Sequence, residues 1–318
     1  MSIADGVKAF VEPANKLIET VSRGIGTLYE PNKIRRMADA KAYEIEKISS
    51  AVRSNMDMPI IYNPENGVIV DASNFNELAE RAGKRFLFHE ITKQQNIDSV
   101  VSKAHDELKD VGDIPSDPVE QDWVLRFFNS VGEVSNEQMQ NLWAKVLSGE
   151  VKKPGSFSLR TLNLLSSLSK KEADTIKEIA PYSINRHGVN FICGDVDLHS
   201  KYNYSKHLIT LYDCGILAES LTTALTGVVD KNSVFLMAAG IALLSNSNNP
   251  IGYNISVIRF TPVGSELLKL FSFEQNKNYF IECFKKLKTQ HPHLLLTGHN
   301  TLKFMGDSVE YAREDILI

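Results

Sequence analysis

A series of helix-boundary signals in the middle of the chain constrains the fold more than any other feature. Asp117-Pro118 combines an N-cap residue with proline at the first helical position. Ser135-Asn136-Glu137-Gln138 and Ser169-Lys170-Lys171-Glu172 both have the spacing of a capping box. Glycine and proline supply the stops between helices, at Gly149, Pro154, Gly155 and Pro181. The pattern predicts a compact four-helix unit with Trp123 and Trp143 in its core.

The composition changes after Pro181, where glycine, asparagine and β-branched residues become more frequent. Tyr204–Asp213 has the pattern of a helix, whereas Val234–Leu244 and Tyr253–Phe260 are predicted strands separated by a polar loop. Thr261-Pro262 then starts another helix. This order of elements is that of a winged-helix unit.

These signals together predict a mainly α chain. Long N-terminal helices and the four-helix unit are followed by an α+β, winged-helix-like C-terminal domain. The predicted domains are residues 1–112, with the long helices, residues 113–182, the compact helical unit, and residues 183–318, the C-terminal domain and tail.

The N-terminal segment Val7–Leu28 carries apolar residues every three or four positions, which is the spacing of one helix face. The candidate contact residues on this face are Phe10, Leu17, Val21, Ile25 and Leu28. The helix packs on the rest of the protein or on another subunit, or it lies on a membrane surface. The modest number of basic residues beside it favours packing on protein.

A second amphipathic helix is predicted over Asn32–Val52. Its first turn carries Lys33, Arg35 and Arg36, which either contact phosphates or lipid headgroups or form a solvated helix face.

A short hairpin should follow, pairing Ile60-Ile61-Tyr62 with Val68-Ile69-Val70. Ser73 or Asn74 can then cap another long helix that extends to about Lys109. The apolar or small face predicted for that helix includes Phe75, Leu78, Ala82, Phe86, His89, Ile97 and Ala104.

Charge is distributed unevenly along these 318 residues, whose formal net charge is −4. Most of the acidity lies in one stretch, which contains Asp106, Glu107, Asp110, Asp113, Asp117, Glu120 and Asp122. Pro115 and Pro118 interrupt this stretch, and it lacks the glycine pattern of an EF-hand. A solvated connector is therefore favoured over a metal-binding carboxylate cluster.

The cysteines Cys193, Cys214 and Cys283 are sparse, odd in number and without a CxxC spacing, which indicates a reducing compartment. The sequence shows neither the apolar region of a signal peptide nor a run of about 18 apolar residues. A cytoplasmic location is predicted, with peripheral membrane contact as the alternative.

The sequence contains no phosphate-binding loop, nucleophile elbow or zinc-protease motif. No catalytic residue, metal ligand or cofactor is therefore assigned, and an enzymatic role is not favoured. Two histidine-containing segments carry residue types that bind metals: Gly194–His199, and His291-Pro292-His293 with His299. A polar loop and a chance spacing explain them better.

The winged-helix-like unit raises nucleic-acid binding as a further alternative. Its helix offers Lys201, Lys206 and His207, and the loop Ser245–Ile251 has no basic residue. Because phosphate contacts supply most of the affinity for nucleic acid, this charge favours protein contact or dimerisation.

The segments LWAKVLSGE at residues 142–150 and PGSFSLRTL at residues 154–162 resemble a bacterial family catalogued as domain of unknown function 2806. The N-terminal GIGTLYEP at residues 24–31, followed by Ile34-Arg35-Arg36, also resembles it. The same tryptophan-to-Pro-Gly-x-Phe-Ser unit is similar to the abortive-infection alpha group. That similarity implies a role in bacteria–phage conflict and transfers no catalytic residue.

The basic residues of this motif, Lys152, Lys153 and Arg160, are a candidate site for an anionic ligand. The alternative is a structural ion pair between Arg160 and Glu150.

The expected function is that of a non-enzymatic, homo-oligomeric interaction protein, a sensor or effector component in phage defence or a prophage regulator. One alternative is a membrane-active effector that uses the Val7–Leu28 helix. The other is a nucleic-acid binder that uses the C-terminal domain.

Overall fold

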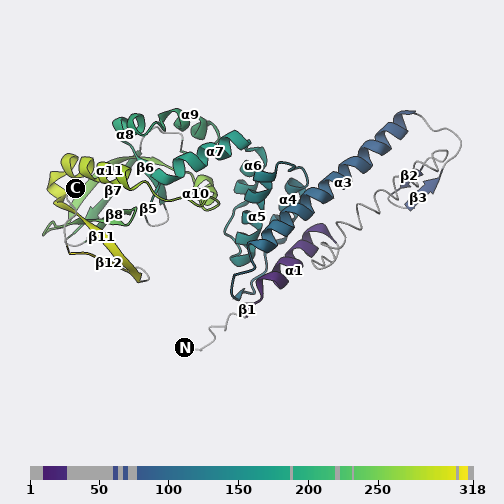
Figure 1. Cartoon of the computed structure of the whole chain (residues 1–318), viewed down its shortest axis with the longest axis horizontal. Coiled ribbons are helices and arrows are strands. Elements are labelled where there is room, and N and C mark those ends of the chain that lie inside the picture. Colours follow the sequence, from purple (N-terminus) through teal and green to yellow (C-terminus); the bar gives the residue numbers. More distant parts are fainter. Residues whose placement is uncertain are drawn as a thin grey trace. The chain divides into compact units, whose positions relative to one another are not determined.

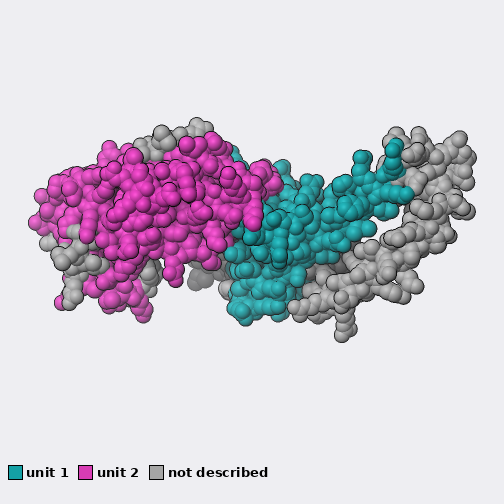
Figure 2. All heavy atoms as spheres, turned by 45° about the horizontal axis from the view of Figure 1, so that its top comes forward, with its two compact units in different colours: residues 1–162 teal, residues 163–318 magenta. Residues whose placement is uncertain are grey.

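The computed structural model describes residues 10–26, 60–63, 67–70, 77–186, 189–218, 223–230, 233–305 and 308–313. The chain divides after Leu162 into two compact units, unit 1 and unit 2, which Figure 2 shows in separate colours.

Unit 1 is mainly helical (Figure 1). Its helices are α1 (Pro13–Ile25), α3 (Glu77–Asp106), α4 (Gln121–Val131), α5 (Glu137–Lys152) and the start of α6 (Leu159–Ser167). Its short strands are β1 (Phe10–Val11), β2 (Ile60–Asn63), β3 (Gly67–Val70) and β4 (Ile114–Pro115). Strand β1 pairs with β4, and β2 pairs with β3, both antiparallel. The β2–β3 pair confirms the predicted hairpin.

The core of unit 1 contains both tryptophans, as predicted, because Trp123 and Trp143 are 3% and 0% exposed. The Phe127 ring stacks on Trp123 with 5.1 Å between centroids and meets Trp143 edge-on at 5.4 Å. The Trp123 indole N–H donates to the carbonyl oxygen of Phe157 at 2.8 Å. The aromatic core of α4 and α5 is thereby fixed to the loop that follows α5.

Two of the predicted helix starts are displaced, and one is confirmed. The N-cap of α5 is Asn136 and not Ser135, because the Asn136 side chain accepts the N–H of Met139 at 3.1 Å. Helix α4 begins at Gln121 instead of Pro118. The capping box that starts with Ser169 is present as predicted.

Unit 2 combines helices with two antiparallel sheets (Figure 1). Its helices are α7 (Lys170–Ile179), η1 (Ala180–Tyr182), α8 (Val196–Lys201), α9 (Ser205–Asp213), α10 (Pro262–Leu268), α11 (Lys277–Gln290) and η2 (Pro292–Leu294). One sheet has the order β5-β6-β10-β7, formed by Ile184–Arg186, Val189–Cys193, Ile251–Arg259 and Thr223–Val229. The other has the order β12-β11-β9-β8, formed by Ser308–Tyr311, Leu296–Met305, Ile241–Ser245 and Ser233–Ala238.

The prediction of a mainly α chain is wrong, because these two four-stranded sheets make the fold mixed α+β. The predicted α+β character of the C-terminal part agrees with the structure. A winged-helix unit would pair Val234–Leu244 with Tyr253–Phe260 as one hairpin. Instead the first segment is split into β8 and β9 by a turn at Ala239 and Gly240, whose φ values are 50° and 73°. The second segment corresponds to β10, which belongs to the other sheet.

Among the helices that the structure describes, none combines the length and the apolar character that a membrane span requires.

Candidate functional site

The apolar face predicted for the N-terminal helix lies partly inside unit 1. Leu17 and Val21 of α1 are buried, and Ile25 is half-buried. Phe10 stands in strand β1. Helix α1 packs against α4 and α5, so this part of its face is core. The other candidates of the N-terminal region, Leu28, Lys33, Arg35 and Arg36, lie outside the described residues.

Gly24 of α1 allows the closest approach of this helix to α4. A Cβ atom at Gly24 would lie 2.1 Å from Cδ2 of Phe128 and 2.8 Å from Cγ1 of Val124. We therefore expect Gly24→Ala to lower the free energy of unfolding by about 1–3 kcal/mol, as overpacking of a core does. Chemical denaturation measures the change. The control is Gly112→Ala, where the added Cβ has no atom within 4 Å, and an equal effect of both changes would contradict the packing account.

The anionic-ligand candidates surround the turn that follows α5. Lys152 is half-buried in the last turn of α5, Lys153 is exposed at its C-cap, and Arg160 is exposed in the first turn of α6. The buried charge at this turn is Glu150, which is 2% exposed. Its carboxylate accepts the backbone N–H groups of Gly155 and Phe157 at 2.5 and 3.0 Å, so it holds the turn itself.

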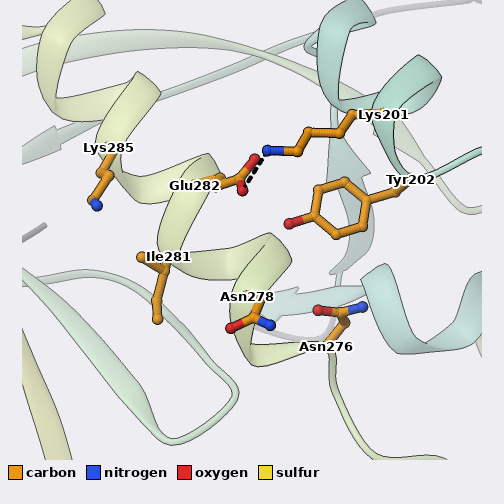
Figure 3. Close-up of a pocket in the computed structure, with 7 residues that line it drawn as sticks. All are labelled: Lys201, Tyr202, Asn276, Asn278, Ile281, Glu282 and Lys285. Atoms are coloured by element: carbon orange, nitrogen blue, oxygen red, sulfur yellow. Dashed lines mark hydrogen bonds and ion pairs between the residues drawn. The ribbon is translucent and has the colours of Figure 1, made fainter.

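A polar hollow of about 380 Å³ lies between the end of α8 and the first three turns of α11 (Figure 3). Its lining residues are Lys201, Tyr202, Asn276, Asn278, Ile281, Glu282 and Lys285. Asn276 is the N-cap of α11, and its side chain accepts the N–H of Tyr279 at 3.0 Å. Because the two sides of the hollow are separated by more than seventy residues in the sequence, no local motif could have indicated it.

One ion pair crosses this hollow. Nζ of Lys201 lies 2.7 Å from Oε1 of Glu282. The hydrogen bond from Lys201 lowers the pKa of Glu282 below its usual value. Burial raises the pKa of Tyr202, and the negative charge of Glu282 adds to the rise. Figure 3 shows the Tyr202 hydroxyl pointing toward the space beside Glu282, so the hollow offers ammonium, amide and phenol groups to a small polar ligand.

Helix α3 carries the most concentrated exposed apolar surface that the structure describes. We call its residues Glu77–Ile91 the α3 arm. Four large side chains within six residues are exposed: Phe86 (61%), Leu87 (55%), Phe88 (67%) and Ile91 (39%). Successive helical residues point about 100° apart, so Phe86, Leu87 and Phe88 cannot all face one side of the helix. No one-sided packing on unit 1 could cover this surface.

The remainder of α3 anchors the arm in unit 1. The Asn96 side-chain N–H donates to the carbonyl oxygen of Gly132 at 2.8 Å. Val100, Val101 and Ala104 are fully buried, and this part of α3 packs against α4 and α5. Figure 1 shows the N-terminal half of α3 extending beyond these helices, and Figure 2 shows it projecting from the body of unit 1.

The spacing of apolar residues places Phe86 on the predicted apolar face of this helix, but that face does not include Leu87, Phe88 and Ile91, which the structure also leaves exposed. The run Phe86-Leu87-Phe88 was the available signal, since three consecutive large apolar residues exceed the width of a one-sided helical stripe.

Comparison with known protein families decides where this chain belongs. Residues 80–283, more than half of the chain, match a family described as "Protein of unknown function (DUF2806)". The chain belongs to the DUF2806 family. Neither the curated proteins nor the solved structures contain a match. The region matched to DUF2806 includes the apolar residues of the α3 arm, the Trp143 helix and most of the polar hollow.

In this DUF2806 protein, the acidic segment between β6 and α8 forms a helix cap. Asp195 is the N-cap of α8 and accepts the N–H groups of Asp197 and Leu198, both at 3.1 Å. Nζ of Lys286 lies 2.6 Å from Asp195 and 2.8 Å from the carboxylate of Asp197. Across the described part of the chain, no group of three or more histidine, cysteine or acidic side chains is placed to hold a metal ion.

His199 of the DUF2806 region follows this cap and is buried, with Nε2 2.7 Å from the carbonyl oxygen of Cys193. Burial lowers the pKa of His199, and the contact with that carbonyl opposes the shift. The unfolded chain, in which histidine has a pKa of about 6.5, therefore takes up this proton before the folded chain does as pH falls. The contribution of His199 to stability is therefore complete above the pKa of the unfolded chain, about 6.5, and is lost as the pH falls below that value.

We expect the thermal midpoint of the wild-type protein to fall more steeply between about pH 7 and pH 5 than that of His199→Gln, which has no imidazole at this position. Thermal unfolding followed by circular dichroism at several pH values measures both slopes. Identical slopes would show that His199 is not linked to stability in this way.

Proposed function

We propose that this chain is a non-enzymatic interaction protein whose contact surface is the α3 arm. The observation that carries the proposal is the exposure of Phe86, Leu87, Phe88 and Ile91 on one projecting helix. Burying a side chain of this kind is worth about 1.5–3 kcal/mol, so a partner that covers the arm gains several such contributions before the entropy of association is subtracted. Exposed apolar clusters of this kind mark interaction sites.

The finer proposal is that the protein acts as a sensor or effector component in bacterial phage defence, or as a prophage regulator. Its support is the similarity of the Trp143 to Phe157 motif to the abortive-infection alpha group. In the structure this motif forms the core, since Trp143 packs on Phe127 and Phe157 accepts the Trp123 indole hydrogen bond. A shared motif of this kind supports a shared helical scaffold, on which the arm is the contact surface.

The membrane-active alternative receives no support from α1, because Leu17 and Val21 of its apolar face are buried in unit 1.

A plating assay tests the proposed function. Bacteria that express the wild-type chain, or the double variant Leu87→Ser/Phe88→Ser, are challenged with a panel of lytic and temperate phages. We expect the wild-type chain to reduce plating of at least one phage and the arm variant to lose that effect. Ile209→Ser is the matched control, because Ile209 is an equally exposed side chain (66%) on α9. Unchanged plating across the panel, or full protection by the arm variant, would overturn the proposal.

A further inference from the structure

We infer that Cys193 and Cys283 form a reversible oxidation site, at which hydrogen peroxide converts two buried thiols into one disulfide. Cys193 is the last residue of β6, and Cys283 lies in the middle of α11. Both residues belong to unit 2. The inference is therefore independent of the proposed function of the α3 arm, which belongs to unit 1.

Contacts made by α11 fix the position of Cys283. The hydroxyl groups of Tyr279 and Tyr204 lie 3.1 Å apart, and Nζ of Lys286 lies 2.6 Å from the carboxylate of Asp195. Residues 279, 283 and 286 are four and three positions apart, so they share one face of the helix. Cys283 therefore lies between these two contacts, on the face of α11 that meets the segment after β6.

The end of β6 places the side chain of Cys193 on the same side as that of Asp195. Gly194 continues the strand, because its N–H donates to the carbonyl oxygen of Ser256 at 2.9 Å. Asp195 itself has extended backbone angles, with φ −80° and ψ 116°. Alternate residues of an extended chain point to the same side. Because α11 binds Asp195 one turn after Cys283, the two cysteines face each other.

The two thiols meet in a hydrogen bond, and their surroundings make them unequal. Cys283 donates and Cys193 accepts, which lowers the pKa of Cys193 and raises that of Cys283 well above its usual value. The backbone N–H of Asp195 and the charge of Lys286 also favour the Cys193 thiolate, against burial and the Asp195 carboxylate. Cys193 is 7% exposed and Cys283 is 1% exposed. Cys193 is therefore the thiol that attacks the peroxide, since the thiolate is the nucleophile.

The oxidation takes place in two balanced steps. Cys193 gives its proton to solvent, and its thiolate attacks one oxygen of hydrogen peroxide. A sulfur–oxygen bond forms, the oxygen–oxygen bond breaks, and the other oxygen leaves as hydroxide, which becomes water with one solvent proton. Cys283 then loses its proton and attacks the sulfur of this sulfenic acid. The sulfur–sulfur bond forms, the sulfur–oxygen bond breaks, and the hydroxyl group leaves as water with a proton. Two thiols lose two electrons, and one peroxide is reduced to two water molecules.

The third cysteine, Cys214, has the opposite environment. Its thiol donates to Oε1 of Glu172 at 3.0 Å, and burial together with this contact raises the pKa of Cys214 to about 12. Cys214→Ser is therefore the matched control. The alternative for Cys193 and Cys283 is a purely structural role, because buried cysteines also pack as small apolar residues.

Oxidation of the folded full-length chain with peroxide tests the inference. The wild-type protein and the variants Cys193→Ser, Cys283→Ser and Cys214→Ser are reduced with dithiothreitol, freed of reductant and exposed to increasing amounts of hydrogen peroxide. N-ethylmaleimide in guanidinium chloride then labels the remaining thiols, and mass spectrometry of the intact chain and its peptides locates them. Dimedone is added in parallel to trap sulfenic acid. Circular dichroism melts verify that each variant is folded.

We expect the oxidised wild-type chain to carry one label where the reduced chain carries three, with the peptides of Cys193 and Cys283 joined. Cys214→Ser should form the same bond. Cys283→Ser should instead accumulate sulfenic acid at Cys193, because the thiol that resolves it is missing. In urea, pairs that include Cys214 should also appear, since the fold no longer selects the partners. Reduced glutathione should restore the thiols of the folded chain, as it does for disulfides that form transiently in reducing compartments.

Three results would overturn the inference. The first is a wild-type chain whose Cys193 and Cys283 stay reduced while peroxide oxidises Cys214, which would assign the pair to core packing alone. The second is a disulfide that involves Cys214 or joins two chains. The third is a Cys193–Cys283 bond that reduced glutathione does not open in the folded chain. The wild-type and Cys214→Ser proteins decide among these results without a change at either buried cysteine, and the phage plating assay is judged separately.

Discussion

Trp143→Ala should destabilise unit 1 by about 3–5 kcal/mol, the usual effect of removing a large aromatic side chain from a core. Trp143 is completely buried and meets Phe127 edge-on, and Phe127 in turn stacks on Trp123. The truncation leaves a cavity that the helices on both sides cannot close, because the Asn136 cap fixes the start of α5 and the Trp123 hydrogen bond fixes α4 to the loop after α5.

Chemical denaturation followed by tryptophan fluorescence and circular dichroism measures this effect. The matched control is Leu125→Ala on α4, where the side chain is 43% exposed and the change should be small. A loss for Trp143→Ala no larger than that of the control would contradict the assignment of Trp143 to the core.

Glu150→Ala should cost about 3 kcal/mol, because it removes the acceptor of two backbone N–H groups in a buried turn. The Glu150 carboxylate accepts from Gly155 and Phe157. It also opposes the effect of burial on Lys16, whose pKa is lowered by desolvation and whose ammonium donates to the carbonyl oxygen of Pro115 at 2.8 Å. The variant leaves both N–H groups unpaired and Lys16 without this nearby negative charge.

Glu150→Gln separates these contributions, since its amide oxygen retains one acceptor but no charge. Denaturation midpoints should place it between the wild-type protein and Glu150→Ala. If Arg160→Ala proved as destabilising as Glu150→Ala, the turn would depend on the ion pair of the alternative hypothesis and not on the backbone contacts.

The helical core of unit 1 was readable from the sequence because its signals are local. Capping residues, prolines and the spacing of Trp123, Phe127 and Trp143 act over short stretches of the sequence. The same holds at the start of unit 2, where the Ser169 capping box is present as predicted. The displaced cap at Asn136 reflects two adjacent residues of similar capping ability.

The two sheets were not predicted, because their pairing is determined by distant residues. Strand β9 is buried along its whole length, so it lacks the alternation that distinguishes strands in a sequence. Ala239 and Gly240 provide a turn inside what had the pattern of one long strand, and β11 pairs with β9 across some fifty residues. The polar hollow was not predicted for the same reason, because Lys201 and Glu282, which form its ion pair, are far apart in the sequence.

The exposure of the α3 arm could not be predicted from the sequence. A periodic stripe of apolar residues indicates which face of a helix is apolar, but not whether another part of the protein covers that face. Phe86 was expected to pack, and the structure leaves it exposed with its neighbours.

Hydrogen exchange of the purified full-length wild-type protein tests most directly whether the α3 arm projects uncovered from unit 1. A projecting helical segment opens readily, whereas a segment packed in a core is protected. We expect backbone amides of residues 81–91 to exchange faster than those of residues 96–104, which include the buried part of the same helix. Equal protection of the two segments would contradict the account.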